Sequence, residues 1–387
     1  MPNVDHYTLN VWQKRQAALL YHFASLDYLK GLKRLIDAMI QGADILLDTA
    51  QSQGRDALIV DERWGARDTS GNWGTYGFPA LKDFQQATAK DIAERAHEVY
   101  SFTGANQCAR LLGELSMRWA TEEEEERFQN SVEFITKYAF YIDYVMERPQ
   151  GLNDGIFNNI WHGVESDFPS LRTPRHAALF PLLPKFHVRT DVEAVTGKPV
   201  PRTGVYVPQD DVYGSPQFGW TGGVCDGSLD EGRTFNDLGL EAARVVGRDN
   251  LWNDSPELLG FIKRAYSHEF EAFLRESRGG RFAPEMLDDA SWAPAFLSSA
   301  CFTTRPCKWY FVEIVPGEFE EPTDEKDTEA VAVIQRVPAE QRCPKAGWWS
   351  TPSKQSSRRY FNLDEVFPAV EGSSYGATFW LWDTDQR

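Results

Sequence analysis

The cysteines and histidines are the side chains best suited to bind a metal, but their spacing forms no recognised site. A zinc site usually has four ligands with short spacings within each pair, whereas this chain has no C-x-x-C pair and no H-E-x-x-H motif. The odd, scattered cysteines do not form a disulfide framework either. We expect reduced, buried thiols and no metal or cofactor at Cys108, Cys225, Cys301, Cys307 and Cys343.

Motifs for nucleophilic and nucleotide chemistry are also missing. The sequence has no G-x-S-x-G, no G-x-x-x-x-G-K-[ST] loop and no G-x-G-x-x-G fingerprint. The glycine-rich stretch 219–223 fits a turn beside a strand. A Cys–His pair that meets only in three dimensions stays open, but we expect no catalytic residue and a protein that is not an enzyme.

The alternative is a carbohydrate-active or other hydrolytic enzyme that uses the Trp-rich C-terminal half. Sugar rings stack on tryptophan, and a glycosidase needs two carboxyl groups at a defined separation, which the spacing here does not reveal. Trp380 and Trp382 alternate on a predicted strand, so both point to one face, and core packing is the competing interpretation. The aromatic platform would consist of Trp348, Trp349, Trp380 and Trp382.

Two N-terminal segments are candidate binding surfaces. The first is an acidic run that follows Thr121, and Thr121 with Glu124 matches a capping box at a helix start. It is either a solvated helix start or a docking surface for a basic partner. The second is the segment 61–79, predicted to be a long loop, whose aromatic side chains could insert into a partner. The candidate residues are Glu122, Glu123, Glu124, Glu125, Glu126, Trp64, Trp73 and Tyr76.

Helical spacing dominates the chain before residue 150. Apolar residues recur at helical intervals over 32–47 and again over 128–146, and a further helix is predicted over 81–102. A stripe over 12–26 precedes the first of these, and the two form either one kinked helix or a hairpin at Gly31. These segments predict a bundle-like helical domain over 1–150.

The chain after residue 150 is predicted to fold differently. Residues 151–200 read as an irregular connector, and 201–387 as a Trp-rich α+β domain. Short strands are predicted at 205–207, 309–315, 331–337 and 377–382, with helices over 234–247 and 255–276 and a solvated hairpin loop at 316–329. Asp254 or Ser255 can cap the second helix. The predicted fold class is therefore α+β, with a mainly antiparallel sheet after the helical part.

Charge excludes some partners. The 387 residues carry a formal net charge of −17, which opposes binding to nucleic acid or to an anionic membrane. No apolar run reaches the roughly 18 residues of a membrane span, and the N-terminus has no signal-peptide pattern. We expect a cytoplasmic protein whose partner is neither nucleic acid nor membrane.

Six C-terminal stretches occur together in order: PRTGVYVP, FGWTGG, TFNDLGLEAARVVGRDNLW, CPKAGWWSTP, SRRYF and YGATFWLWD. In this combination the chain resembles a family of large two-part immunity proteins of bacterial polymorphic-toxin and type VI secretion systems. The resemblance covers mainly residues 200–383. It implies a non-enzymatic protein that binds and neutralises a cognate antibacterial toxin. Because a nuclease has a basic substrate face and this chain is acidic, we expect a nuclease effector.

Overall fold

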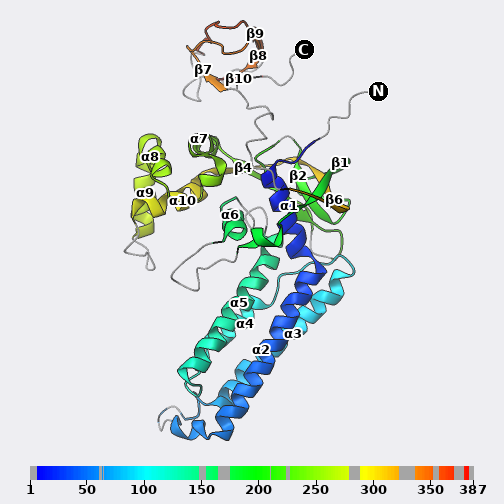
Figure 1. Cartoon of the computed structure of the whole chain (residues 1–387), viewed down its shortest axis with the longest axis vertical. Helices are drawn as coiled ribbons and strands as arrows, with labels where there is room; N and C mark the ends of the chain where they lie inside the picture. The colour runs from blue at the N-terminus through cyan, green and yellow to red at the C-terminus, as the bar shows by residue number, and fades with distance from the viewer. Residues whose placement is uncertain are drawn as a thin grey trace. The chain divides into compact units, whose positions relative to one another are not determined.

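The structure is a computed structural model that describes residues 7–60, 63, 65–147, 154–163, 175–209, 211–223, 227–278, 288–321, 336–351, 357–369 and 379–382. The chain divides into two compact units, unit 1 at 1–322 and unit 2 at 323–387. The fold is α+β, with a helical part that precedes the strands and mainly antiparallel sheets, so the predicted fold class is confirmed (Figure 1).

Unit 1 begins with a bundle of helices. They are α1 (Val11–Ala24), α2 (Leu26–Ser52), α3 (Ser70–Arg95), α4 (Ala105–Gly113) and α5 (Glu122–Met146). The break between the first two stripes falls at Ser25, which caps α2. Gly31 lies inside α2, where a Cβ would meet the hydroxyl of Tyr138 on α5 at 2.3 Å. The glycine thus allows α2 and α5 to approach closely.

The prediction for 61–102 is wrong in part, because α3 begins at Ser70 and ends at Arg95. Thr69 caps the helix by accepting a hydrogen bond from the backbone N–H of Asn72. One of the glycines that suggested a loop, Gly77, serves packing inside the helix instead. A Cβ on Gly77 would lie 2.9 Å from Trp73 and 3.0 Å from Leu115.

A four-stranded antiparallel sheet adjoins the bundle, in the order β1 (Leu183–Val195), β6 (Lys308–Glu320), β2 (Gly204–Pro208) and β3 (Gln217–Gly219). The predicted irregular connector 151–200 is wrong at 154–162, which is helical, and at β1, which pairs with β6 through two register shifts. The sheet shares a core with the helices through Val188, Val205, Val207, Phe218 and Val312. Unit 1 therefore spans the predicted boundaries between 1–150, 151–200 and 201–387.

The rest of unit 1 holds α6 (Asp154–His162) and a helical cluster with its own core. The cluster comprises α7 (Asp237–Val246), α8 (Pro256–Ala265), α9 (Ser267–Arg278) and α10 (Asp289–Ala300), beside the pair β4 (Gly232–Phe235) and β5 (Phe302–Arg305). The two predicted helices differ in detail, since 234–235 are strand and 255–276 breaks at Tyr266. Ser255 caps α8, as one of the two predicted alternatives.

Unit 2 contains a small antiparallel sheet in the order β7 (Arg336–Pro338), β10 (Phe379–Trp382), β8 (Gly347–Ser350) and β9 (Arg359–Phe361). The predicted strands at 205–207 and 309–315 are confirmed in unit 1, and 379–382 is confirmed here. The predicted loop 316–329 is wrong at 316–320, because β6 extends to Glu320, and the predicted strand 331–337 is confirmed at 336–337. Residues 322–329, 331–335 and 377–378 of these predictions lie outside the described residues.

Candidate functional site

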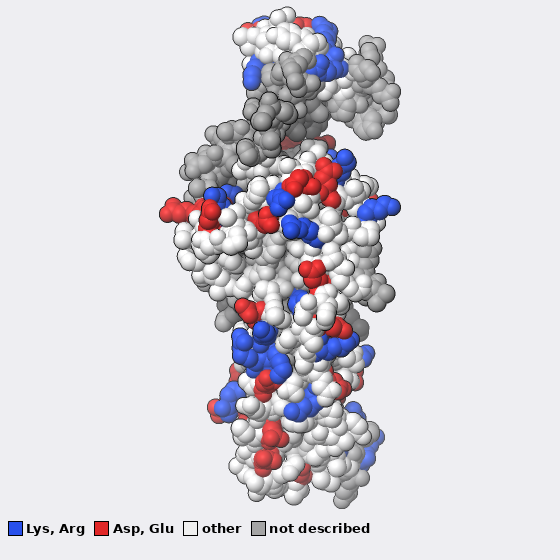
Figure 2. All heavy atoms as spheres, turned by 90° about the vertical axis from the view of Figure 1, so that its right-hand side faces the viewer, with Lys and Arg blue, Asp and Glu red and all other residues white. Residues whose placement is uncertain are grey.

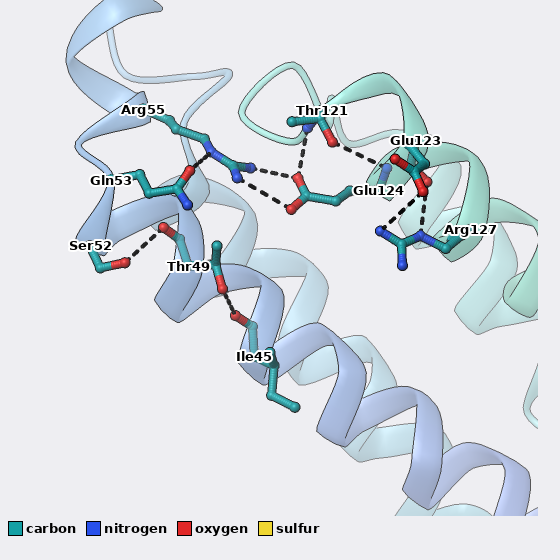
Figure 3. A network of polar contacts seen from close by, with 9 residues as sticks. All are labelled: Ile45, Thr49, Ser52, Gln53, Arg55, Thr121, Glu123, Glu124 and Arg127. Atoms are coloured by element: carbon teal, nitrogen blue, oxygen red, sulfur yellow. Dashed lines mark hydrogen bonds and ion pairs between the residues drawn. The ribbon is translucent and has the colours of Figure 1, made fainter.

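The two N-terminal segments singled out in the sequence meet at one end of the bundle, away from the sheet (Figure 1). We call this end the bundle tip: the 3-10 turn η1 (Arg55–Leu58) with residues 59–60, the first turns of α3 and the start of α5. Arg55 joins them, because its guanidinium donates to both carboxylate oxygens of Glu124, at 2.5 and 3.3 Å (Figure 3). Two surfaces that looked like alternatives are therefore neighbours.

Glu124 has a structural role at the tip. The predicted capping box is confirmed: the Glu124 backbone N–H donates to Thr121 Oγ1 at 3.3 Å, and the Thr121 N–H donates to Glu124 Oε2 at 2.8 Å. The hydrogen bond from Arg55 is the largest cause that lowers the pKa of Glu124 to about 2. The side chain of Glu124 is also largely buried. The prediction that all five glutamates dock a partner is therefore wrong for Glu124.

The other four glutamates remain accessible to different degrees. Glu122, Glu123 and Glu126 are exposed and Glu125 is half-buried. Glu123 pairs with Arg127 at 3.9 Å, but both side chains are more than two-thirds exposed, so the pair contributes little. These carboxylates at the N-terminus of α5 interact favourably with the helix dipole. They also place negative charge on the surface, where a partner could contact it.

Hydrogen bonds fix the shape of the tip. Asp56 in η1 accepts from the backbone N–H and the hydroxyl of Ser70, both at 2.7 Å, which attaches η1 to the start of α3. Arg118, before α5, pairs with Asp68 at 3.6 Å. Three segments far apart in sequence are thereby held together without a partner.

The three predicted aromatic contacts have different fates. Trp73 is 1% exposed and packs against Trp119 and Phe128, with ring centroids 5.7 and 5.4 Å apart. It is a core residue of the tip, so the prediction that it binds a partner is wrong. Tyr76 is 63% exposed on α3 and stays a candidate. Trp64 lies outside the described residues.

Exposed apolar residues at the tip were missed in the sequence. Leu58 is 87% exposed, and Val60, two residues on, is also exposed, as is Ile45 near the end of α2. The sequence signal for these exposed side chains was the run Ala57-Leu58-Ile59-Val60, which begins three residues after Gly54. This run is too short and too close to the end of α2 to bury all its side chains. Exposed apolar side chains gathered within a polar rim are typical of protein-binding surfaces.

A cavity of about 390 Å³ lies where the loop after α3 meets the sheet. Its lining includes Glu98, Arg202, Thr203, Thr221 and Glu313. Glu98 accepts hydrogen bonds from the hydroxyls of Thr221 and Thr203. These bonds lower the pKa of Glu98, whereas a glycosidase acid requires a raised one. Arg202 pairs with Glu313 at 3.7 Å. Glu98 therefore does not fit the acid of a glycosidase.

The tryptophans of unit 2 are mainly structural. Trp349 and Trp380 are buried in its core with Phe361 and Phe367. Trp380 lies on β10, which pairs with strands on both sides as predicted for a central strand. Trp348 is half-buried, with the Arg358 guanidinium 4.4 Å from its ring centre. The predicted sugar platform is therefore wrong for Trp349 and Trp380, while the side chain of Trp382 lies outside the described residues.

The described cysteines Cys108, Cys301, Cys307 and Cys343 form no disulfide, and Cys108, Cys301 and Cys343 are buried. Burial raises the pKa of Cys108 to about 11, which disfavours the reactive thiolate. No group of three His, Cys, Asp or Glu side chains in the described ranges is placed to hold a metal ion. Cys225 lies outside those ranges.

No protein-family model, curated protein or solved structure matches this chain. None of the helices in the described part of the chain is long and apolar enough to cross a bilayer. On the face of unit 1 that Figure 2 shows, Lys and Arg are interspersed with Asp and Glu. The bundle tip likewise carries both signs of charge, because Arg118 and Arg127 are exposed near the glutamates of α5, and it adds exposed apolar side chains.

Proposed function

We propose that the protein is a cytoplasmic immunity protein that binds and neutralises a cognate antibacterial toxin. The observation that carries this proposal is the bundle tip, where exposed glutamates of α5 adjoin exposed Leu58, Val60 and Tyr76 on hydrogen-bonded segments. A preformed surface with apolar contacts and an acidic margin suits a protein partner with a basic face.

The proposed toxin is a nuclease effector. A nuclease must present Lys and Arg to phosphates, so its substrate groove complements an acidic surface and a chain of net charge −17. Occupying that groove or the active site would block the toxin without any chemistry by the inhibitor. The resemblance of the six C-terminal stretches to immunity proteins supports the same proposal.

Co-expression tests the proposal directly. The product of the adjacent open reading frame is expressed in one cell with and without this chain, and the chain carries an affinity tag. We expect the neighbour to kill alone, to be tolerated with this chain and to co-elute with it. Degraded DNA or RNA in the dying cells would identify a nuclease. A harmless neighbour that does not co-elute would contradict the proposal.

A further inference from the structure

One face of α5, between α4 and α6, carries a hollow of about 600 Å³. Its α5 residues follow helical spacing from Gln129 to Tyr144, so the hollow extends along about 22 Å of the helix. Ala109 of α4 and Ile160 of α6 form parts of its sides. The other α5 residues that line it are Val132, Glu133, Thr136, Lys137, Phe140 and Tyr141.

The hollow is an apolar groove with incomplete contacts. Val132, Phe140 and Tyr144 are only half-buried there. Tyr141 is 5% exposed, yet its hydroxyl has no hydrogen-bond partner among the described residues. Tyr141 packs against Phe23 and His176 of the core, so its side chain closes the floor of the groove. No described helix covers this stretch of α5.

Acidic residues continue the groove toward the bundle tip. At 3.6 residues per turn, Glu122, Glu125 and Glu126 lie on the same side of α5 as Gln129 and Val132. Inside the groove itself, Glu133 and Lys137 contribute opposite charges one turn apart, so the negative charge that a basic helix would meet lies at the start of α5. One continuous stripe thus changes from acidic at the start of α5 to aromatic near its end.

We propose that this stripe binds an amphipathic basic helix of the protein partner, an inference that rests on the proposed function in taking the toxin as the source of that helix. Apolar side chains at i, i+3, i+4 and i+7 would fill the groove beside Phe140 and Tyr144. Lys and Arg on the same helix would face Glu122, Glu125 and Glu126. The groove length accommodates about four turns.

A synthetic peptide tests this chemistry without the toxin. The probe is a fluorescein-labelled 18-residue peptide with leucines at helical spacing and lysines elsewhere, and its control replaces every lysine by glutamate. Binding is measured by fluorescence anisotropy to the full chain at 0.1 and 0.3 M salt. We expect the lysine peptide to bind more weakly at higher salt and the glutamate peptide not to bind.

The matched variants are Phe140→Arg in the groove and Phe134→Arg, on the same helix but 52% exposed and outside it. We expect Phe140→Arg to weaken binding of the lysine peptide at least tenfold and Phe134→Arg to change it less than twofold. Unchanged circular dichroism shows that both variants fold. Equal binding by the two variants would overturn the groove as the site.

The same variants separate this inference from the proposed function. If the neighbour's product is neutralised by the chain and equally by Phe140→Arg, the immunity function stands and the groove is overturned. If the neighbour is harmless but the peptide still distinguishes Phe140→Arg from Phe134→Arg, the groove stands and its partner is a different protein with a basic helix.

Discussion

At the bundle tip, Leu58, Val60, Tyr76 and three glutamates of α5 are exposed, whereas Trp73 is buried. Unit 2 has the sequence motifs that looked most distinctive, yet Trp349 and Trp380 form its core. In both regions tryptophans are buried in the core. At the tip, the side chains that a partner could contact are ones that the sequence did not single out, such as Leu58 and Val60. Trp73, Trp349 and Trp380, which the sequence singled out for binding, therefore serve core packing instead.

The largest effect is expected in unit 2. Trp349→Ala removes a fully buried side chain that packs on Phe367 at a ring distance of 4.9 Å, so it should cost about 3–5 kcal/mol. A small core cannot lose that much, and we expect unit 2 of the full chain to unfold. Hydrogen exchange of residues 336–382 measures this. The half-buried neighbour Trp348→Ala is the control, with an expected loss near 1 kcal/mol; equal effects would contradict the assignment of Trp349 to the core.

Trp73→Ala makes the same test at the tip. The loss of contacts with Trp119 and Phe128 should destabilise unit 1 by about 3–5 kcal/mol in urea unfolding. Because unit 1 has a much larger core than unit 2, we expect it to stay folded at 25 °C. A change below about 1 kcal/mol would show that Trp73 is accessible, as first predicted.

Two carboxylates of α5 should respond to pH with opposite signs. Burial raises the pKa of Asp143 to about 6 from 3.8, although Thr103 donates two hydrogen bonds to it. Its stabilising contribution is full below pH 3.8 and is lost as pH rises through 6, about 3 kcal/mol in all. The lowered pKa of Glu124 instead gives stability above pH 4.5 that is lost as pH falls toward 2.

Urea unfolding of the wild type, Asp143→Asn and Glu124→Gln at pH 4 and 7 measures both signs. Raising the pH from 4 to 7 should favour Asp143→Asn relative to the wild type by about 2 kcal/mol. The same change should disfavour Glu124→Gln, because the ionised carboxylate holds Arg55. A stability difference from the wild type that does not vary with pH would contradict the assigned cause.

The smallest effect on stability is expected from the exposed apolar residues. Leu58→Ser and Tyr76→Ser should each change the free energy of unfolding by less than about 0.5 kcal/mol. If they contact the partner centrally, each should weaken its binding by about 2 kcal/mol in titration calorimetry. Unchanged affinity in both variants would confine the contact to the glutamates.

Periodicity and capping rules predicted much of the bundle, because α5 and α2 keep their apolar stripes over many turns. They failed where packing outweighs local preference. The glycines of α3 suggested a loop. Gly77 instead leaves room for the side chains of Trp73 and Leu115. Leu115 lies 38 residues further along the chain, so no local pattern reveals this contact. β1 was missed because it becomes a strand only through pairing with β6, more than 100 residues later.

The candidate site was predictable as parts but not as an assembly. The spacing of Thr121 and Glu124 predicts the capping box from four consecutive residues. Nothing local indicates that Arg55 of η1 binds Glu124, that Asp56 binds Ser70 or that Arg118 pairs with Asp68, the contacts that hold the two candidate segments together. Ion pairs between distant segments have no sequence period, so the bundle tip emerges only in three dimensions.

Association kinetics with the neighbour's product test the central claim most directly. Glu122, Glu123 and Glu126 are replaced together by Lys, leaving Glu124 in place, and the control reverses Glu269, Glu271 and Glu276 on α9, which are equally exposed and change the net charge by the same amount. The account predicts an association rate reduced about tenfold or more for the tip variant at low salt, with a flatter salt dependence, and a much smaller change for the control. Equal rates for the two variants would contradict binding at the bundle tip.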